Sequence, residues 1–563
     1  TKEDDPSAIY ITARKPVLDV GSSRALSLAK TYITQCSEAH KACEALSMSF
    51  DQSLPTRLID YSNPDAPRLV LTGGQRGRYL ALSYVWGEEQ KHSTTTLNES
   101  TYCADGIDSS LLPQTIVDAI RVTYALGVKF LWVDSLCIIQ DSYQNQRHEL
   151  GKMHIIYRNA YLTIIAASAW KVSDGFLHDR PPAPALSLPF ICPAPSPPCS
   201  NDPGACATTP QVGTIHIATT RYSHAQEPIS ARGWCLQEYL LSPRALIFTS
   251  ETLQLRCQTE TRSIGEAFYC LHGERRLPIL LLLPDPPTLQ YGTAQWGVAH
   301  DEWLRVVEDY SKRSISDPLD KLVACGAIAP GFQRVLGAEY LAGVWRDTLL
   351  VDLLWRKAED KDAQLSRPAL YRAPSWSWAA VEGPVRMVGS VWPRANSRPW
   401  GARDHAQVVR CNIVLEDTTL PFGKVTGGSL VLRTALMTCV LRPDGLYRAE
   451  RPVSSGMQTP HGLVGGSDQE GNVLERLGKV YVDIEADAGI QSTLWAVLLS
   501  CDASDPFKSP EGLLVTTVQT EGPNPDAEPG TKRGTPVCRR VGTFRMDRWD
   551  AFRDVLWEEI ELV

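Results

Sequence analysis

The chain has 563 residues, of which 43% are hydrophobic and 21% charged, a composition typical of a folded protein of several domains. Its formal net charge is −8, so a general electrostatic attraction to nucleic acid or to an anionic membrane is not expected. No apolar run is long enough to span a bilayer. We therefore expect a soluble, cytoplasmic protein with neither nucleic acid nor membrane as a partner.

The strongest secondary-structure pattern lies between residues 78 and 169. Strands and helices alternate there, which predicts a small parallel sheet with right-handed crossovers. The predicted strands are Tyr79–Val85, Val128–Val133 and Tyr161–Ser168, and the predicted helices run from Pro113 to Gly127 and from about Tyr143 to Arg158. The carboxyl ends of parallel strands share one edge, where ligands bind in open α/β sheets. We expect this edge to carry Trp86, Glu88, Asp134, Cys137 and Trp170.

The rest of the chain divides by composition. Residues 181–210 are rich in proline and predict an irregular surface insertion. A helix over Trp234–Leu241 and a hairpin over 245–257 follow, and then three helices at 301–313, 318–329 and 340–357. We predict a lead-in (1–26), an α/β domain (27–265), a helical region that ends on PSWSWA (266–390) and a β-rich carboxy-terminal domain (391–563).

Cysteine and tryptophan are the most informative residue types. The 15 cysteines are odd in number and mostly lie in apolar segments, which favours buried thiols over a disulfide framework. Cys36, His40 and Cys43 would share one face of a helix predicted over about residues 27–46. Because no fourth ligand is nearby, we favour packing over a metal site. The 15 tryptophans outnumber the 11 phenylalanines, which suits both packing and the binding of a flat, partly polar ligand.

Candidate site residues rest on position, because the sequence contains no dinucleotide, Walker, zinc-protease or serine-hydrolase motif. Asp134 directly follows a buried strand, so it either caps the next turn or faces a ligand. Cys137 is interpreted as a small buried residue rather than a nucleophile, since no neighbour in the sequence lowers its pKa. No cofactor is predicted.

Two further groups of candidates come later in the chain. Arg232, Trp234, Gln237 and Glu238 crowd one predicted helix, where Arg232 and Glu238 would pair with each other or with Asp134, or bind a ligand. Trp376 and Trp378 alternate in PSWSWA and would either wall a pocket or close a domain seam.

Four ordered motifs resemble the fungal heterokaryon incompatibility (HET) domain. They are RYLALSYVWGEE (78–89), LPQTIVDAIRVTYALGVKFLWVDSLCIIQDS (112–142), ELGKMHIIYRNAYLTIIAAS (149–168) and ARGWCLQEYLLSPRALIF (231–248). The resemblance implies a role in non-self recognition and programmed cell death, and a Toll/interleukin-receptor-like α/β fold. Some relatives of that fold cleave NAD with a glutamate, for which Glu149 or Glu88 would be the candidates. The chain departs from the family at Val85, commonly Cys, and at Gly233 and Cys235, often Ala and Thr.

Two functions follow, and we favour the first narrowly. In the first, an aromatic pocket binds and transforms a small molecule, for instance as a cofactor-free cyclase (Diels–Alder-type) of fungal secondary metabolism, because such catalysis needs shape and a few hydrogen-bond donors. Its catalytic candidates are Asp134, Arg232, Gln237 and Glu238, and its substrate-binding candidates are Trp86, Glu88, Cys137, Trp170, Trp234, Trp376 and Trp378. The alternative is an incompatibility effector that contacts a partner protein, with NAD cleavage as a less favoured activity.

Overall fold

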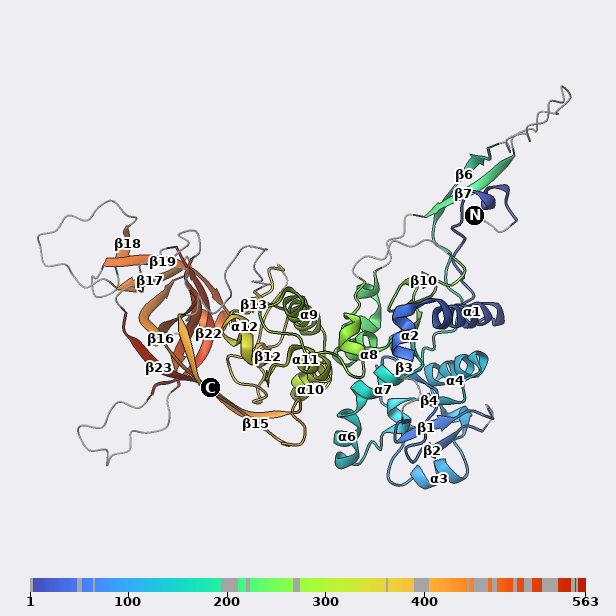
Figure 1. The fold of residues 1–563 in the computed structure, drawn as a ribbon, viewed down its shortest axis with the longest axis horizontal. Coiled ribbons are helices and arrows are strands. Elements are labelled where there is room, and N and C mark those ends of the chain that lie inside the picture. The colour runs from blue at the N-terminus through green and yellow to red at the C-terminus, as the bar shows by residue number, and fades with distance from the viewer. Residues whose placement is uncertain are drawn as a thin grey trace, which may run out of the picture. The chain divides into compact units, whose positions relative to one another are not determined.

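The structure is a computed structural model of the chain. It describes residues 4–47, 53–63, 66–193, 211–218, 223–266, 274–360, 363–388, 405–442, 445–449, 464–467, 473–489, 494–500, 509–518, 535–547, 552 and 555–563. The chain forms two compact units, Thr1–Asp285 and Pro286–Val563 (Figure 1). Among the described helices, none combines the length and the apolar character that a membrane crossing requires.

An eight-stranded mixed sheet forms the centre of the first unit, in the order β10-β9-β8-β5-β3-β4-β1-β2. Strands β8, β5, β3 and β4 are parallel, and the strands outside them are antiparallel. The strands are β1 (Arg57–Asp60), β2 (Arg68–Leu71), β3 (Tyr79–Ser83), β4 (Phe130–Trp132), β5 (Leu162–Ile165), β8 (Arg244–Phe248), β9 (Leu253–Cys257) and β10 (Thr261–Ser263). The predicted α/β class with parallel strands is confirmed, whereas the likeness to Toll/interleukin-receptor domains stays a prediction.

The order of the parallel strands creates a switch point. β3 comes first in the chain, β4 pairs on one side of it and β5 on the other. The connection after β3 leads to β4 on one side, and the connection after β5 leads to β8 on the other side, so these two connections leave in opposite directions. In open α/β sheets this is where a crevice forms at the carboxyl ends of the strands.

The helices of the first unit follow local sequence signals. α4 (Gln114–Leu126) begins after Pro113 and ends at Gly127, whose φ of 75° suits a glycine that terminates a helix. α1 (Ser23–Ala39) packs along α4 and also contacts β9. The other helices are α2 (Lys41–Ser47), α3 (Glu99–Ala104), α5 (Asp134–Cys137), α6 (Tyr143–Leu150), α7 (Met153–Asn159) and α8 (Gly233–Leu241).

Two predicted helices are each divided in the structure. His40 has an extended backbone (φ −96°, ψ 103°) and separates α1 from α2. Gly151 and Lys152 separate α6 from α7, although the backbone of both residues stays in the helical region. The periodicity of apolar residues continues across both breaks, so periodicity alone could not reveal them.

The proline-rich insertion is more regular than predicted. β6 (Ala185–Ile191) and β7 (Val212–Ala218) pair along their whole length as an antiparallel hairpin, so the prediction of irregular structure is wrong for 185–191. The prolines at 181, 182 and 184 precede β6, and Pro189 lies within it, where a two-stranded hairpin tolerates a residue without a backbone N–H. Cys192 is buried, whereas Cys199 and Cys206 lie outside the described residues.

The second unit begins with helices packed around buried tryptophans. They are α9 (Ala294–Ser311), α10 (Lys321–Gly326), α11 (Ala329–Leu336) and α12 (Leu349–Asp352). The predicted helix 340–357 is wrong, since the structure has a tight pair, β11 (Tyr340–Leu341) and β12 (Val344–Trp345), before α12. Ala342 and Gly343 have φ values of 47° and 102°, which a helix cannot contain. A Cβ at Gly343 would lie 2.5 Å from Trp378 Nε1, so only glycine fits at this turn, where the backbone packs against the Trp378 ring.

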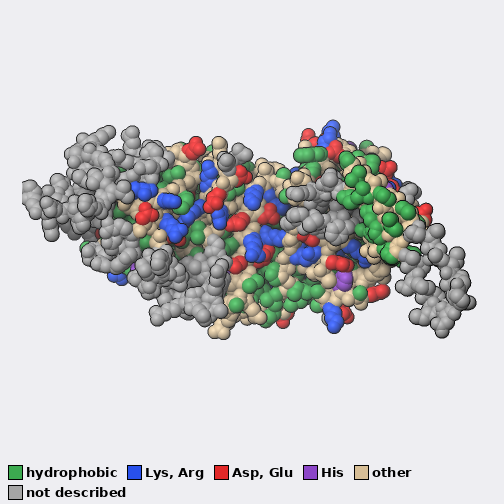
Figure 2. Space-filling view, turned by 90° about the horizontal axis from the view of Figure 1, so that it is seen from above, with side chains coloured by type: hydrophobic (Ala, Val, Ile, Leu, Met, Phe, Trp, Pro, Cys, Tyr) green, Lys and Arg blue, Asp and Glu red, His purple; other side chains and the backbone are tan. Residues whose placement is uncertain are grey.

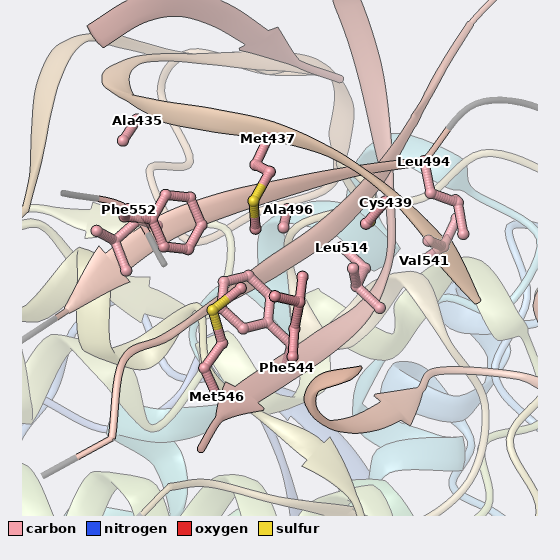
Figure 3. Packing of buried hydrophobic residues seen from close by; sticks show 12 residues of the cluster. Ala435, Met437, Cys439, Leu494, Ala496, Leu514, Val541, Phe544, Met546 and Phe552 are labelled. Carbon is pink, nitrogen blue, oxygen red and sulfur yellow. The ribbon is translucent and has the colours of Figure 1, made fainter. Parts of the chain in front are cut away.

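A nine-stranded sheet completes the second unit and confirms the predicted β-rich region. Pairings β16–β23 and β19–β22 close the sheet on itself. Its strands are β15 (Ala406–Leu415), β16 (Val425–Arg442), β17 (Gly445–Ala449), β18 (Val464–Ser467), β19 (Val473–Val482), β20 (Leu494–Ser500), β21 (Glu511–Thr517), β22 (Val537–Met546) and β23 (Trp557–Leu562). Met437, Phe544 and Phe552 belong to the apolar core that these strands enclose (Figure 3).

Acidic and basic side chains are interspersed over the described surface drawn in Figure 2. This pattern agrees with the modest net charge of −8 and differs from the single-sign field that steers a protein to nucleic acid.

Candidate functional site

The candidate site lies at the carboxyl edge of the parallel strands in the first unit (Figure 1). Tyr84 to Glu88 follow β3, Asp134 follows β4, and the segment to Trp170 follows β5. The first turn of α8 reaches the same edge, because the Cys235 thiol lies 3.8 Å from the carbonyl oxygen of Tyr84. Sequence positions 84, 134, 170 and 235 are thereby brought to one edge.

Asp134 is the polar centre of this edge. Its Oδ2 accepts a hydrogen bond from the indole Nε1 of Trp86 at 2.9 Å, and its Oδ1 accepts one from the backbone N–H of Ser135 at 2.7 Å. The Tyr84 hydroxyl donates to the Ser135 hydroxyl at 3.0 Å. Burial raises the pKa of the Asp134 carboxyl, whereas the hydrogen bonds from Tyr84, Trp86 and Ser135 act in the opposite direction. Asp134 therefore binds the backbone of the next residue and the indole that follows the neighbouring strand.

Glu238 places a second carboxyl near Asp134. It lies on α8 and its residue is only 5% exposed, so water does little to stabilise its charge. Burial raises the pKa of Glu238 to about 7, and the negative charge of Asp134 acts in the same direction. Arg232, at the start of α8, acts on both carboxyls in the lowering direction. Oε2 of Glu238 has no hydrogen-bond partner among the described residues.

The loops that follow β3 and β5 are tied together beside this centre. The backbone N–H of Val172 donates to the carbonyl of Trp86 at 2.9 Å, and the N–H of Ser173 donates to Glu88 Oε1 at 3.0 Å. Gly87 has a φ of 66°, and a Cβ there would lie 2.5 Å from the carbonyl oxygen of Trp170. Glu88 is exposed, and its hydrogen bonds with Ser173 lower its pKa, so it serves as an ionised clamp between the two loops.

The predicted tryptophans differ in where they lie. The Trp170 ring is 71% exposed, and Trp86 and Trp234 are partly buried. Trp376 and Trp378 are fully buried in the second unit, where Trp378 Nε1 donates to the carbonyl of Gly343 at 3.0 Å. The first three therefore keep some exposure in the first unit, and the last two pack inside the second unit.

Gln237 and Cys137 face the interior of the first unit. Gln237 is fully buried, and its Nε2 lies 3.9 Å from Sδ of Met153 on α7. Cys137 is 1% exposed, and the backbone N–H of Val133 lies 3.5 Å from its sulfur. Burial raises the pKa of Cys137 to about 12, so its thiol stays protonated at neutral pH.

The structure adds residues that sequence reasoning missed. Tyr84 belongs to the edge, and its position two residues before Trp86 in the SYVWGE segment was the available signal. Glu149 was already a candidate for NAD cleavage, but its burial was missed: it is 1% exposed, and its Oε1 has no hydrogen-bond partner among the described residues. Cys257 lies beside Cys36, His40 and Cys43, which makes these four side chains the group best suited to hold a metal.

The edge can hold and transfer a proton. Two carboxyls in low-dielectric surroundings resist ionising together, so the pair retains a proton near neutral pH. The indole N–H of Trp86 holds the Asp134 carboxyl in place, and the Tyr84 hydroxyl donates to Ser135 beside it. Such a pair has the groups that general acid–base catalysis uses, and this catalysis is most efficient when the pKa of the catalytic group lies near the ambient pH.

Comparison with known proteins identifies this part of the chain. Residues 79–238 match the family described as Heterokaryon incompatibility protein (HET). The match begins at the first residue of β3 and ends at Glu238, so it contains the sheet edge described above. No curated protein and no solved structure matches the chain. The chain therefore carries a heterokaryon incompatibility (HET) domain, which lies within its first unit.

Proposed function

We propose that this chain is an effector of fungal heterokaryon incompatibility, the process in which fusion of unlike fungal cells ends in cell death. The observation that carries the proposal is the family match over residues 79–238, together with what that range contains. Trp86, Asp134 and Glu238 all lie within it and form one hydrogen-bonded or electrostatically coupled group. The family's name supports the biological role, and the group supplies the residues on which it would depend.

The effector activity is expected to require the two carboxyl side chains, Asp134 and Glu238, at the sheet edge. A buried carboxyl with a pKa near 7 destabilises the fold at neutral pH, and such groups concentrate at functional sites. The orphaned Oε2 of Glu238 points to the same conclusion, because buried polar atoms without partners are rare in folded proteins.

The test is inducible expression of the chain in a fungal host that lacks it. Wild type should arrest growth, and Asp134→Asn and Glu238→Gln should abolish the arrest, because each keeps the side-chain shape and removes a titratable group. Glu89→Gln is the matched control, since Glu89 is an exposed carboxylate in the same loop and is not among the candidate site residues. Full-length, soluble protein must be present in every strain.

Two results would count against the proposal. Absence of growth arrest with abundant wild-type protein would contradict the effector role. Arrest that persists in both carboxyl variants would mean that the effector acts through another surface.

A second candidate, supported by the proton-holding edge, is the transformation of a small molecule. Asp134 and Glu238 would donate a proton to the substrate or accept one from it, and Arg232 would compensate the negative charge of these carboxyls. Trp86, Trp170 and Trp234 would contact the ligand. A cyclisation, including a Diels–Alder-type reaction, only rearranges bonds within its substrate and needs no cofactor, so it would suit such an edge.

The same strains distinguish the two candidates. A new metabolite that depends on Glu238 and appears without growth arrest supports the enzyme. Release of nicotinamide from NAD, lost on Glu149→Ala, would instead indicate NAD cleavage by the buried glutamate of α6.

A further inference from the structure

Four side chains of the types that bind metals converge in the first unit. Cys36 lies on α1, His40 between α1 and α2, Cys43 on α2, and Cys257 at the end of β9. One ligand atom from each lies within 4.8 Å of every other. The helical segment alone offered three ligands, and the fourth arrives because β9 packs against α1. We propose that Cys36, His40, Cys43 and Cys257 bind one structural zinc ion.

The donor set and its spacing suit zinc. Three cysteines and one histidine are a recurrent structural set, arranged as a closed tetrahedron. Zinc–sulfur bonds of about 2.3 Å place the sulfurs of a tetrahedral site about 3.8 Å apart. The observed separations of up to 4.8 Å therefore require a contraction of about 1 Å or less, which side-chain rotation can provide.

His40 is oriented as a metal ligand. Its Nδ1 lies 3.4 Å from the sulfur of Cys257, and its Nε2 lies 3.5 Å from Oε1 of Glu260. A ligating histidine commonly offers one ring nitrogen to the metal and donates the other N–H to a carboxylate, which fixes the tautomer. Glu260 supplies that carboxylate, so it is a positioning residue rather than a ligand.

Groups around the sulfurs would stabilise thiolates. Arg244 is 1% exposed, and its Nε donates to the sulfur of Cys36 at 3.4 Å. The backbone N–H groups of Thr259 and Glu260 donate to the sulfur of Cys257 at 3.4 and 3.5 Å. Three thiolates around a divalent zinc leave one net negative charge, which the buried guanidinium of Arg244 would balance.

Simple packing of thiols explains these contacts less completely. A thiol is a weak hydrogen-bond acceptor, and packing alone needs neither a guanidinium nor two N–H donors directed at sulfur. A disulfide would use two of the cysteines and leave the third, with His40, without a role. A hollow of about 250 Å³, lined in part by Cys36, His40 and Cys257, provides a route for the ion.

The metal would hold together parts that are distant in the sequence. Cys36, His40 and Cys43 precede the HET match at 79–238, and Cys257 follows it. One ion would thus fasten the amino-terminal helices to β9, the second strand of the sheet. Such a link stabilises the folded state by restricting a long loop of the unfolded chain.

The primary test is metal analysis of the full chain purified without chelators or an affinity metal. We expect about one zinc ion per chain, which is released when the thiols are modified. Cobalt substituted for zinc should give the intense visible bands of a tetrahedral site and a thiolate-to-cobalt charge-transfer band. Cys257→Ser should lose the metal, whereas Cys103→Ser, which removes a thiol outside the cluster, should retain it. Glu260→Gln should weaken zinc binding by about 10- to 100-fold.

Wild-type protein keeps the test decisive if the cysteine variants fail to fold. Chelation should then lower its melting temperature, and zinc should restore both the melting temperature and the metal content. Metal-free folded protein with three readily alkylated cysteines, a disulfide within the cluster, or a stoichiometric metal other than zinc would each overturn the proposal.

Discussion

The indole Nε1 of Trp86 lies 2.9 Å from Oδ2 of Asp134, and this contact joins the carboxyl ends of two adjacent parallel strands. The backbone ladder between β3 and β4 ends at Ala81 and Trp132, so the side chains continue the pairing beyond it. The candidate edge is therefore braced by a hydrogen bond to a carboxylate, which is stronger than one between neutral groups.

Removing this bond should loosen the edge. Trp86→Phe keeps an aromatic ring and removes the N–H, so we expect the first unit to lose about 1–2 kcal/mol of unfolding free energy. Hydrogen exchange followed by mass spectrometry measures this locally, with faster exchange in peptides from 79–88 and 128–142. Trp170→Phe, at a ring that is 71% exposed, should leave exchange unchanged. Equal exchange in both variants would mean that the bond contributes no stability.

The stability of the first unit should depend on pH through Glu238. Its pKa rises from 4.5 to about 7 on folding, so the folded state binds the proton more tightly than the unfolded state does. The resulting stabilisation is complete below about pH 4.5 and is lost as the pH rises through about 7, a difference of about 3 kcal/mol.

Glu238→Gln should remove this dependence. In urea denaturation at pH 5 and pH 8, the variant should gain stability relative to wild type as the pH rises. Glu88→Gln should show no such gain, because the pKa of Glu88 is lowered and the group is ionised throughout this range. If the difference in unfolding free energy between Glu238→Gln and wild type is the same at both pH values, Glu238 ionises normally.

Gly87 and Gly73 form a matched pair for separating backbone strain from steric clash. Both have positive φ, 66° and 59°, but a Cβ at Gly87 would meet Trp170 and Lys171, whereas one at Gly73 would meet nothing within 4 Å. Gly73→Ala should cost about 1 kcal/mol from strain alone. Gly87→Ala should cost more, because the loops after β3 and β5 must also move apart. Thermal unfolding compares the two, and equal losses would exclude the clash.

Arg540 should be indispensable in the second unit. It is fully buried, binds both carboxylate oxygens of Asp483 at 2.9 Å, and lies 3.5 Å from the Trp355 ring centroid. Arg540→Met leaves Asp483 buried with weakened compensation, which should cost about 3–5 kcal/mol. Arg539→Met, at a partly exposed neighbour, should cost about 1 kcal/mol or less. Calorimetry of both variants measures the difference, and similar losses would contradict this assignment.

Local signals predicted the core of the first unit well. The apolar run that stops at Asp134 contains β4, and Pro113 and Gly127 flank α4. These features were predictable because the residue types at and beside each position determine its burial and its backbone geometry. The same reasoning failed over 340–357, where an apolar segment buried on several sides has no period that separates a helix from short strands.

Relations between distant segments could not be predicted. The i, i+4, i+7 spacing of Cys36, His40 and Cys43 was visible, but Cys257 joins them only through the packing of β9 against α1. Glu238 acquires its raised pKa from burial, which depends on several elements at once. Sequence reasoning could name these residues, but only the folded chain gives their environment.

The strand order also has a consequence for synthesis. β5 ends at Ile165, and its outer neighbour β8 begins at Arg244, so the ribosome must make residues 166–243 before that pairing can form. At about 5–20 residues per second, this takes roughly 4–16 seconds. Throughout that interval the nascent chain presents the unpaired edge of β5, a template for wrong pairing. The yield of folded protein should therefore depend on the speed of translation through 166–243 and on the chaperones that cover this edge.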